Sequence, residues 1–458
     1  MPSKLNVRRH RSHARDIVLP MLPMDASGHE RQVSEPKTAS ASAVTIDTPA
    51  QLNAPTAVDL FCGAGGLSTG LRNAGFRVVR AVDHFDAAVK TYRRNVGDHV
   101  EKTEIHEAME LPPATIITGG PPCQGFSSAG LRRSGDKRNN LVSVFAELIA
   151  RHRPAAFIFE NVEGFLTAES GSRVLDLLGP LVAAGYRIHL RKINAANFGV
   201  AQHRKRVLGI GGLGWDPTFP APTHRAFGAP GVHRVGVDLP PTPTVLDALA
   251  GLGPPTAKSP GSPTGHFAVS LDADDLARVS ALREGQTMQD LPETLWHESY
   301  KRRAFRRVMD GTPADRRGGA PCGIRRLVGE QPCKAITSGA RSEFVHPTEN
   351  RYLTMREAAR IQGFLDDFEF IGRQSDIALL IGNAVPPLLG EMVGRQLAED
   401  LRTAKLGEKP GALLSFVPTS AGGMSPAMER TVNLVRERFA PSDIKRNKNA
   451  EAQAEWRF

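Results

Sequence analysis

Residues 57–66 read Ala-Val-Asp-Leu-Phe-Cys-Gly-Ala-Gly-Gly, a short apolar run that breaks into a glycine-rich turn. Apolar residues at helical spacing follow at Leu67, Leu71 and Ala74, so we expect the glycines to join a strand to a helix. Glycine lets the backbone turn tightly and approach a ligand at the carboxyl end of a strand. The spacing is not Gly-x-Gly-x-x-Gly, which disfavours a dinucleotide pyrophosphate site. Alone, the stretch is also compatible with a plain turn between strand and helix.

Strand and helix patterns alternate on both sides of this turn. We expect strands at 78–82, 116–118, 156–159 and 207–210, and helices at 87–92, 141–150 and 174–184. This alternation predicts right-handed βαβ crossovers. The predicted fold class is therefore α/β, with a largely parallel sheet.

The chain divides into five predicted segments. The composition changes near residue 214. Residues 217–263 contain eleven prolines, and residues 299–326 contain nine Lys and Arg residues but only two acidic residues. The segments are a disordered basic N-terminal extension (1–55), an α/β segment (56–214), a smaller irregular domain (215–347), a segment in which apolar helical patterning resumes (348–402) and a C-terminal extension (403–458). We expect the extension to be a polar tail with one exposed helix at 428–439.

Composition excludes several classes of protein. The 458 residues include only four scattered cysteines and no Cys-x-x-Cys pair, so neither a disulfide scaffold nor a zinc ribbon is expected, and no metal is expected. The sequence has no run of 18 uncharged apolar residues, so we expect no membrane span. No apolar segment follows the basic N-terminus, so we expect no secretory signal. We therefore expect a cytoplasmic protein. The net charge of +10 favours a polyanionic partner.

Two chemistry-bearing residues are expected above one crevice. Cys123 lies in Gly-Gly-Pro-Pro-Cys-Gln-Gly-Phe-Ser (119–127), where prolines and glycines present the thiol on a loop. A nucleophilic thiol needs such access, although most unpaired cysteines are buried structural residues. Glu160 ends the next strand, with one helix between, so both side chains should emerge at neighbouring strand ends. A carboxyl group there can act as an acid or as a hydrogen-bond donor.

Three further features suit a nucleoside ligand and an anionic or carbonyl group. Phe61 is placed to stack on an adenine, and Asp83, twenty residues after Gly63, is placed to bind a ribose diol. The run Gln-His-Arg-Lys-Arg (202–206) precedes a strand, where fixed cations can hold a carbonyl oxygen or a phosphate. By itself this run is also compatible with a solvated basic turn.

These residues, in this order, closely resemble the DNA cytosine-5 methyltransferases. Six ordered motifs carry the resemblance: DLFCGAGG (59–66), GGPPCQGFS (119–127), ENVEGF (160–165), QHRKR (202–206), REAARIQGF (356–364) and GNAVPP (382–387). The resemblance covers about 57–212 and 345–400. It implies a Rossmann-like S-adenosylmethionine-dependent methyltransferase domain with a mostly parallel, doubly wound sheet. It also implies that 215–347 stands in the place of the family's variable target-recognition domain and that 348–402 returns to complete the methyltransferase domain begun by 56–214. It also implies that the helix at 386–401 packs beside the first helix.

The resemblance implies S-adenosylmethionine as the cofactor. The expected cofactor-binding residues are Asp59, Phe61, Gly63, Gly65, Gly66, Asp83, His84, Glu104, Pro121, Leu141, Asn383 and Val385. Glu104 is the candidate for an acid that the family places near the adenine, and His84 stands where the family often has a bulky residue. Cys62, within the glycine turn, is expected to be structural, and Cys322 and Cys333 are expected to be packed or surface thiols.

The resemblance also assigns catalytic roles. Cys123 would attack C6 of a flipped cytosine, Glu160 would bind or protonate N3, and Arg204 and Arg206 would grip the base and orient Glu160. Addition at C6 makes C5 nucleophilic enough to accept a methyl group, and loss of the C5 proton then releases the thiol. The base must leave the helix for this chemistry, and the loop 124–140 would close over it.

Double-stranded DNA is the implied substrate. The expected DNA contacts are Gln124, Ser127, Arg132, Arg133, Arg302, Arg303 and Arg306. The implied enzyme is sequence-specific and of the bacterial restriction-modification type, a monomer associated with the nucleoid and with a cognate restriction endonuclease as a candidate partner. Two alternatives stay open: a tRNA cytosine-5 methyltransferase with the same chemistry, and a catalytically silent DNA-binding regulator. Intact Cys123, Glu160, Arg204 and Arg206 argue against the regulator.

Overall fold

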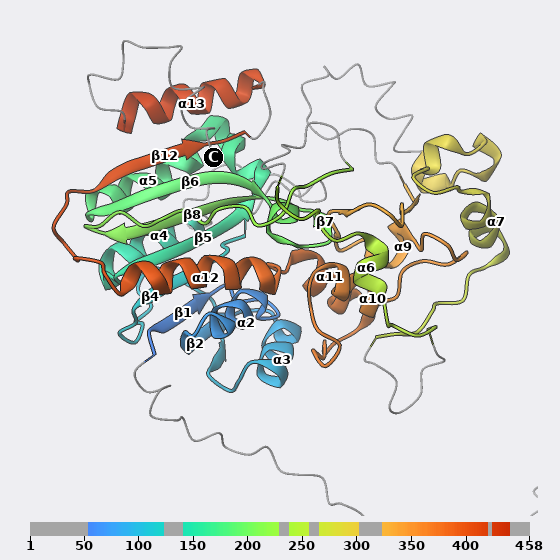
Figure 1. Cartoon of the computed structure of the whole chain (residues 1–458), viewed down its shortest axis with the longest axis horizontal. Coiled ribbons are helices and arrows are strands. Elements are labelled where there is room, and N and C mark those ends of the chain that lie inside the picture. Colours follow the sequence, from blue (N-terminus) through green and yellow to red (C-terminus); the bar gives the residue numbers. More distant parts are fainter. Residues whose placement is uncertain are drawn as a thin grey trace, which may run out of the picture. The chain divides into compact units, whose positions relative to one another are not determined.

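The computed structural model describes residues 54–122, 141–228, 238–255, 265–301, 323–419 and 424–439, which belong to a compact unit spanning 49–458. Its centre is an eight-stranded sheet in the order β12-β6-β8-β5-β4-β1-β2-β3 (Figure 1). The strands are β1 (Thr56–Leu60), β2 (Arg77–Asp83), β3 (Val100–Lys102), β4 (Ile116–Gly119), β5 (Ala156–Val162), β6 (Tyr186–Asn194), β8 (Lys205–Leu213) and β12 (Ala412–Val417). The α/β prediction is confirmed, and the four strands predicted beyond the opening run are present.

All neighbouring strands of this sheet pair in parallel except at β8, which runs antiparallel to both β5 and β6. The reason is the short connection before β8. β6 ends at Asn194 and β8 begins at Lys205, and these two residues pair with each other. The intervening residues form only the short helix η3 (Ala195–Phe198) and β7 (Gln202–His203), which is too little chain for a crossover helix.

Helices cover both faces of the sheet. One face carries α2 (Gly66–Asn73) and α12 (Pro387–Leu401), and the other carries α4 (Leu141–His152), α5 (Ser172–Ala183) and α13 (Pro426–Phe439) (Figure 1). Side chains alternate accordingly: Val58 packs towards α4 and α5, and Ala57 packs towards α2 and α12. A Cβ added at Gly70 of α2 would lie 2.3 Å from the Pro387 carbonyl oxygen, so the two backbones touch. The predicted pairing of the helix at 386–401 with the first helix is confirmed.

The remaining elements are short. Helix α3 (Asp86–Asn95) packs against β2 and β3. Between β8 and α12 lie α6 (Val245–Leu249), α7 (Ala273–Ala281), η4 (Met288–Asp290), η5 (Glu293–Leu295), β9 (Arg325–Arg326), β10 (Cys333–Lys334), α9 (Ala340–Glu343), β11 (Phe344–Val345), α10 (Met355–Ile361) and α11 (Gln374–Asn383). Two small ladders join β10 to β7 and β11 to β9.

The segment that returns after residue 348 divides between two cores. Helices α10 and α11 share an apolar cluster with Val245, Leu327 and Ile336, whereas α12 packs on the sheet. A separate cluster around Val279, Tyr300 and Ile324 lies within the irregular region. Arg326, which is 5% exposed, ties that cluster together because its guanidinium donates to the carbonyl oxygens of Val279, Leu282 and His346.

The prediction of a polar tail after residue 403 is wrong for the described part of that segment. β12 adds an edge strand parallel to β6. α13 is a helix as predicted, but it is not exposed on all sides, because Met428, Thr431, Val432 and Val435 are buried. It packs on α5 and on η2 (Glu163–Gly171), the segment that follows Glu160. A six-residue edge strand carries too weak a pattern to be distinguished from a tail in the sequence.

One stretch, Gln374–Leu401, is long and apolar enough by composition to cross a membrane, which the sequence-based expectation did not anticipate. The structure breaks this stretch into α11 and α12 around Ala384–Pro386, and 67% of its most apolar window is buried within the fold. Packing against the sheet and against the core that α10 and α11 share accounts for its apolar character.

Candidate active site

The turn after β1 brings strained backbone to the carboxyl edge of the sheet. Phe61 has a φ of 58°, in the left-handed region, which costs a residue with a Cβ atom about 1–2 kcal/mol. Gly63 and Gly65 also have positive φ, 55° and 91°. A Cβ at Gly65 would lie 2.8 Å from the Tyr92 ring, whereas a Cβ at Gly63 would point into open space. Strain in a non-glycine residue beside open space is typical of a turn that contacts a ligand.

Asp83, at the end of β2, holds this turn in place. Its carboxylate accepts hydrogen bonds from the backbone amides of Gly63 at 2.9 Å and Phe85 at 2.8 Å. Two accepted bonds leave further acceptor capacity on the carboxylate for a ribose hydroxyl. His84 is exposed, with its Nδ1 3.8 Å from Asp83 Oδ1. The structure therefore brings both predicted residues to the glycine turn.

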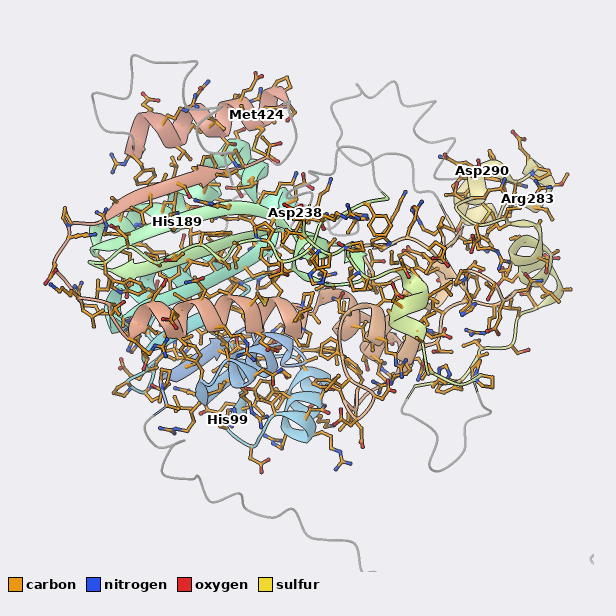
Figure 2. The ribbon with its side chains drawn as sticks, in the orientation of Figure 1. His99, His189, Asp238, Arg283, Asp290 and Met424 are labelled. Carbon is orange, nitrogen blue, oxygen red and sulfur yellow. The ribbon has the colours of Figure 1, made fainter. Side chains whose placement is uncertain are left out.

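Beneath the turn lies a chain of polar groups that sequence reasoning missed, apart from Asp59. The Asp59 carboxylate is 1% exposed and accepts a hydrogen bond from Ser68 Oγ at 2.5 Å. The Tyr92 hydroxyl donates to Ser68 Oγ at 2.9 Å and lies 3.0 Å from Nε2 of His99, which Figure 2 labels. Burial raises the pKa of Asp59 to about 7, and the hydrogen bond from Ser68 opposes this shift. Ser68 lies on α2 and Tyr92 on α3, so only the packing of these two helices brings them together, and no local motif reveals the chain.

The loop between α11 and α12 meets the same turn from a distant part of the sequence. A Cβ at Gly66 would lie 2.2 Å from the Val385 carbonyl oxygen. Asn383 is exposed and Val385 is half-buried. The loop is held by Gln362, whose Nε2 donates to the carbonyl oxygens of Ile381 at 3.0 Å and Ala384 at 2.9 Å. The structure thus brings two of the predicted cofactor residues, Asn383 and Val385, to the loop that touches the glycine turn.

The second half of the site lies at the ends of β4 and β5. Glu160 Oε1 is 2.9 Å from Arg206 Nε, and the two side chains are only 11% and 12% exposed. Burial lowers the pKa of Arg206, and the charge of Glu160 opposes that shift. Asn161 Nδ2 donates to the Pro121 carbonyl oxygen at 2.9 Å, and a Cβ at Gly120 would lie 3.1 Å from Glu160 Oε2. The segment that precedes Cys123 in the sequence is therefore held directly against Glu160.

Arg204 has partners other than the predicted ones. It is fully buried, and its guanidinium donates to the carbonyl oxygens of Ile336 at 3.0 Å and Gly382 at 2.8 Å. Burial lowers its pKa well below the ordinary value. Gln202 joins the same network, because its Oε1 accepts from the Ile336 amide at 3.1 Å and its Nε2 donates to Gln362. The residues of the QHRKR motif therefore have two roles. Arg206 pairs with Glu160, whereas Gln202 and Arg204 hydrogen-bond to the main chain at Ile336 and Gly382.

Other predicted residues lie further from these contacts or outside the description. Leu141 is half-buried at the start of α4, and Glu104 is exposed just beyond β3. Cys62 and Cys333 are free and buried, as expected of structural thiols, and burial raises the pKa of each. The residues that lie outside the described ranges are Cys123, Gln124, Ser127, Arg132, Arg133, Arg302, Arg303, Arg306 and Cys322, together with the rest of the loop 124–140.

A model of the family described as C-5 cytosine-specific DNA methylase matches residues 56–223 and 279–399, which is more than half of the chain. The chain belongs to this family. The two matched segments contain all six sequence motifs, and the unmatched part between them falls in the predicted target-recognition region. The family prediction is confirmed.

Curated relatives of this methylase include two similar bacterial enzymes. The Type II methyltransferase M.AgeI of Thalassovita gelatinovora is 32% identical over 433 residues, which cover 76% of this chain and 99% of the relative. The Type II methyltransferase M1.HphI of Haemophilus parahaemolyticus is 31% identical and covers 74% of this chain and 85% of its own length. β12 and α13 lie beyond the segments that match the family.

A solved structure supports the fold of the methylase. A protein from E. coli, assigned as a prophage-encoded DNA modification methyltransferase, superimposes with a TM-score of 0.54 at 24% identity, covering 76% of this chain and 99% of that one. Within the described ranges, no three His, Cys, Asp or Glu side chains gather as a metal-binding group.

Proposed function

We propose that this methylase transfers a methyl group from S-adenosylmethionine to C5 of a cytosine within a specific sequence of double-stranded DNA. The observation that carries the proposal is the buried pair of Glu160 and Arg206, with Gly120 and Pro121 packed against it. Gly120 and Pro121 lie just before Cys123 in the sequence. An acid and a fixed cation beside a thiol-bearing segment is the set of groups that activation of C5 requires.

The glycine turn fits S-adenosylmethionine. Phe61 is strained, Gly63 borders open space, and the buried hydroxyl of Thr118, which pairs in register with Asp59, has no hydrogen-bond partner among the described residues. Phe61 would stack on the adenine, and Asp83 would bind the ribose. The bound cofactor supplies an electrophilic methyl group on a sulfonium. The other residues proposed to bind the cofactor, directly or by holding its site, are Asp59, Gly65, Gly66, His84, Glu104, Pro121, Leu141, Asn383 and Val385.

The chain's own residues carry the rest of the chemistry. The Cys123 thiolate adds to C6 of the cytosine while Glu160 donates a hydrogen bond or a proton to N3, so that electron density moves to C5. After C5 has gained the methyl group it loses its proton, and the Cys123–C6 bond breaks to restore the ring. Arg206 keeps Glu160 oriented. Arg204 supports the site indirectly, because it hydrogen-bonds to the main chain at Ile336 and Gly382.

The target base must leave the duplex to reach these groups. The proposed DNA contacts remain Gln124, Ser127, Arg132, Arg133, Arg302, Arg303 and Arg306. Residues 215–347 would form the target-recognition domain, which is supported by the interruption of the family match at 224–278 and by the apolar cluster around Tyr300.

The cellular setting is part of the same proposal. The similarity to Type II methyltransferases supports DNA over tRNA as the substrate and supports a cognate restriction endonuclease as the partner. The proposal has the enzyme act as a monomer on nucleoid DNA in the bacterial cytoplasm. The two alternative hypotheses from the sequence, a tRNA methyltransferase and a catalytically silent regulator, receive no specific support from the site.

Purified wild-type and Cys123→Ser proteins test the proposal. Transfer of a radiolabelled methyl group to unmethylated DNA is expected for the wild type and absent for Cys123→Ser, with binding of S-adenosylmethionine nearly unchanged in calorimetry. Cys322→Ser is the matched thiol control and should retain transfer. Near-normal turnover in Cys123→Ser would overturn the proposed chemistry, and transfer to tRNA but not to DNA would overturn the proposed substrate.

A further inference from the structure

Asp59 is a buried acid without a cationic partner in the described part of the chain. Its side chain is 1% exposed, and the groups that act on its carboxyl are burial itself, the hydrogen bond from Ser68 and the negative charge of Asp83. A buried carboxylate is costly unless a positive charge or enough hydrogen bonds compensate it. Within the described residues, Asp59 receives hydrogen bonds from Ser68 alone, through its hydroxyl and its backbone amide, and it faces a second acid across the turn.

The elements around Asp59 supply few charges. The titratable or polar groups that face it are Cys62 in the turn, Ser68 on α2, Asp83 on β2, Tyr92 on α3, His99 before β3 and Thr118 on β4. The nearest cation on α2, Arg72, donates to the Val96 carbonyl oxygen at 3.0 Å. On α12 the first charged residue is Glu391, which is paired with Arg395.

The hydrogen bonds are oriented towards the ionised form of Asp59. Tyr92 donates to Ser68, and Ser68 donates to the carboxylate, so each donor points towards Asp59. Burial and the charge of Asp83 act in the opposite sense. The balance raises the pKa of Asp59 to about 7, so its charge changes near neutral pH.

We propose that Asp59 is a positioning residue that distinguishes the cationic S-adenosylmethionine from its neutral product, S-adenosylhomocysteine, by placing a negative charge beneath the turn that holds the cofactor. The inference rests on the proposed function. It deepens that function because it names the residue that senses the charge of the sulfonium. After methyl transfer the sulfur is a neutral thioether, and the attraction to Asp59 is lost.

The consequence is a linkage between pH and cofactor choice. S-adenosylmethionine favours ionised Asp59, so its affinity should rise as the pH rises through the pKa of about 7. S-adenosylhomocysteine has the same adenosine and amino-acid groups without the sulfonium charge, so it should not share this rise. Each unit by which the bound cation lowers the pKa of Asp59 corresponds to about a tenfold gain in affinity.

Calorimetric titrations of the full-length protein with both ligands, from about pH 5.5 to about pH 8.5, test the inference. The informative quantity is the Kd of S-adenosylhomocysteine divided by that of S-adenosylmethionine, because groups that act equally on both ligands cancel. In the wild type this ratio should rise with pH, and in Asp59→Asn it should be flat. Ser68→Ala should move the midpoint to higher pH, because it removes a donor that lowers the pKa of Asp59. Ser415→Ala, a buried serine on the edge strand β12, should leave the midpoint in place.

A flat ratio in the wild type, or an unchanged slope in Asp59→Asn, would overturn the inference. Ser68→Ala and a count of protons released by the wild type in buffers of different ionisation enthalpy keep the test valid if Asp59→Asn does not fold. Proton release should accompany S-adenosylmethionine but not S-adenosylhomocysteine near neutral pH; equal release for both would contradict the assignment. Absence of binding by either ligand at every pH would instead overturn the proposed function, and this inference with it.

Discussion

Phe61 affects the stability of the protein in two opposite ways, because its strained backbone destabilises the fold and its ring stabilises the fold by packing. Substitutions at this position separate the two effects. The φ of 58° stores about 1–2 kcal/mol in any residue that has a Cβ atom, and glycine avoids this cost. The ring itself is half-buried and packs against the core on the α4 and α5 side of the sheet. Phe61→Ala should therefore lose the packing and keep the strain, whereas Phe61→Gly should lose the packing and release the strain.

The two variants should reverse the usual order of stability. At an ordinary position, Gly→Ala stabilises a protein by about 0.4–1 kcal/mol because the unfolded chain has less freedom. At position 61 we expect Phe61→Gly to have a free energy of unfolding about 1 kcal/mol higher than Phe61→Ala. Urea unfolding of the cofactor-free proteins measures the difference. A Phe61→Ala protein that is as stable as Phe61→Gly would refute the strained conformation.

Cofactor binding should follow the ring and not the strain. Stacking of an aromatic side chain on a base contributes about 1–3 kcal/mol. Both variants should therefore bind S-adenosylmethionine with about 5- to 150-fold lower affinity, the factor that corresponds to 1–3 kcal/mol. Calorimetry at fixed pH measures this loss, and an unchanged Kd in both variants would show that the ring does not stack on the adenine.

Three further substitutions test the contacts around the site. Gly66→Ala places a Cβ 2.2 Å from a carbonyl oxygen of the loop between α11 and α12, so it should abolish cofactor binding or folding; a normal Kd would contradict this close approach. Glu160→Gln and Arg206→Met should each lower the free energy of unfolding by about 3 kcal/mol, and the double variant should lose clearly less than the sum, whereas additive losses would show that the pair is not coupled. Gly171→Ala forces a left-handed residue against Thr431 of α13 and should cost about 1–3 kcal/mol in urea unfolding, while Gly164→Ala, which meets open space in the same segment, should cost little. Equal losses would argue against the close contact between Gly171 and α13.

Local hydrophobic patterns were enough to predict the secondary structure and the turns around the site. The opening strand, the glycine turn, the alternating helices and the ends of β4 and β5 all follow from runs of apolar residues and their breakers. Motif order also predicted that the helix at 386–401 would return to the first helix, because REAARIQGF and GNAVPP resemble parts of the methyltransferase domain although they follow the irregular region.

What the sequence did not reveal depends on long-range pairing. The direction of β8 follows from the length of the chain after β6, which was not recognised as a strand. β12 finds its partner more than two hundred residues earlier, and its six residues alternate too weakly to mark an edge strand. Arg204 and Arg206 look alike in sequence, but only the fold determines that one is enclosed by main-chain carbonyl groups and the other faces Glu160.

The central claim is methyl transfer to C5 of cytosine in a specific DNA sequence, and base-resolution mapping of 5-methylcytosine tests it most directly. DNA is taken from a host without cytosine methylation that expresses either the wild type or Cys123→Ser, both verified as soluble and folded. The account predicts methylation confined to one short sequence in the wild-type sample and absent from the Cys123→Ser sample. Unmodified DNA in the presence of folded wild-type protein, or methylation that persists in Cys123→Ser, would contradict it.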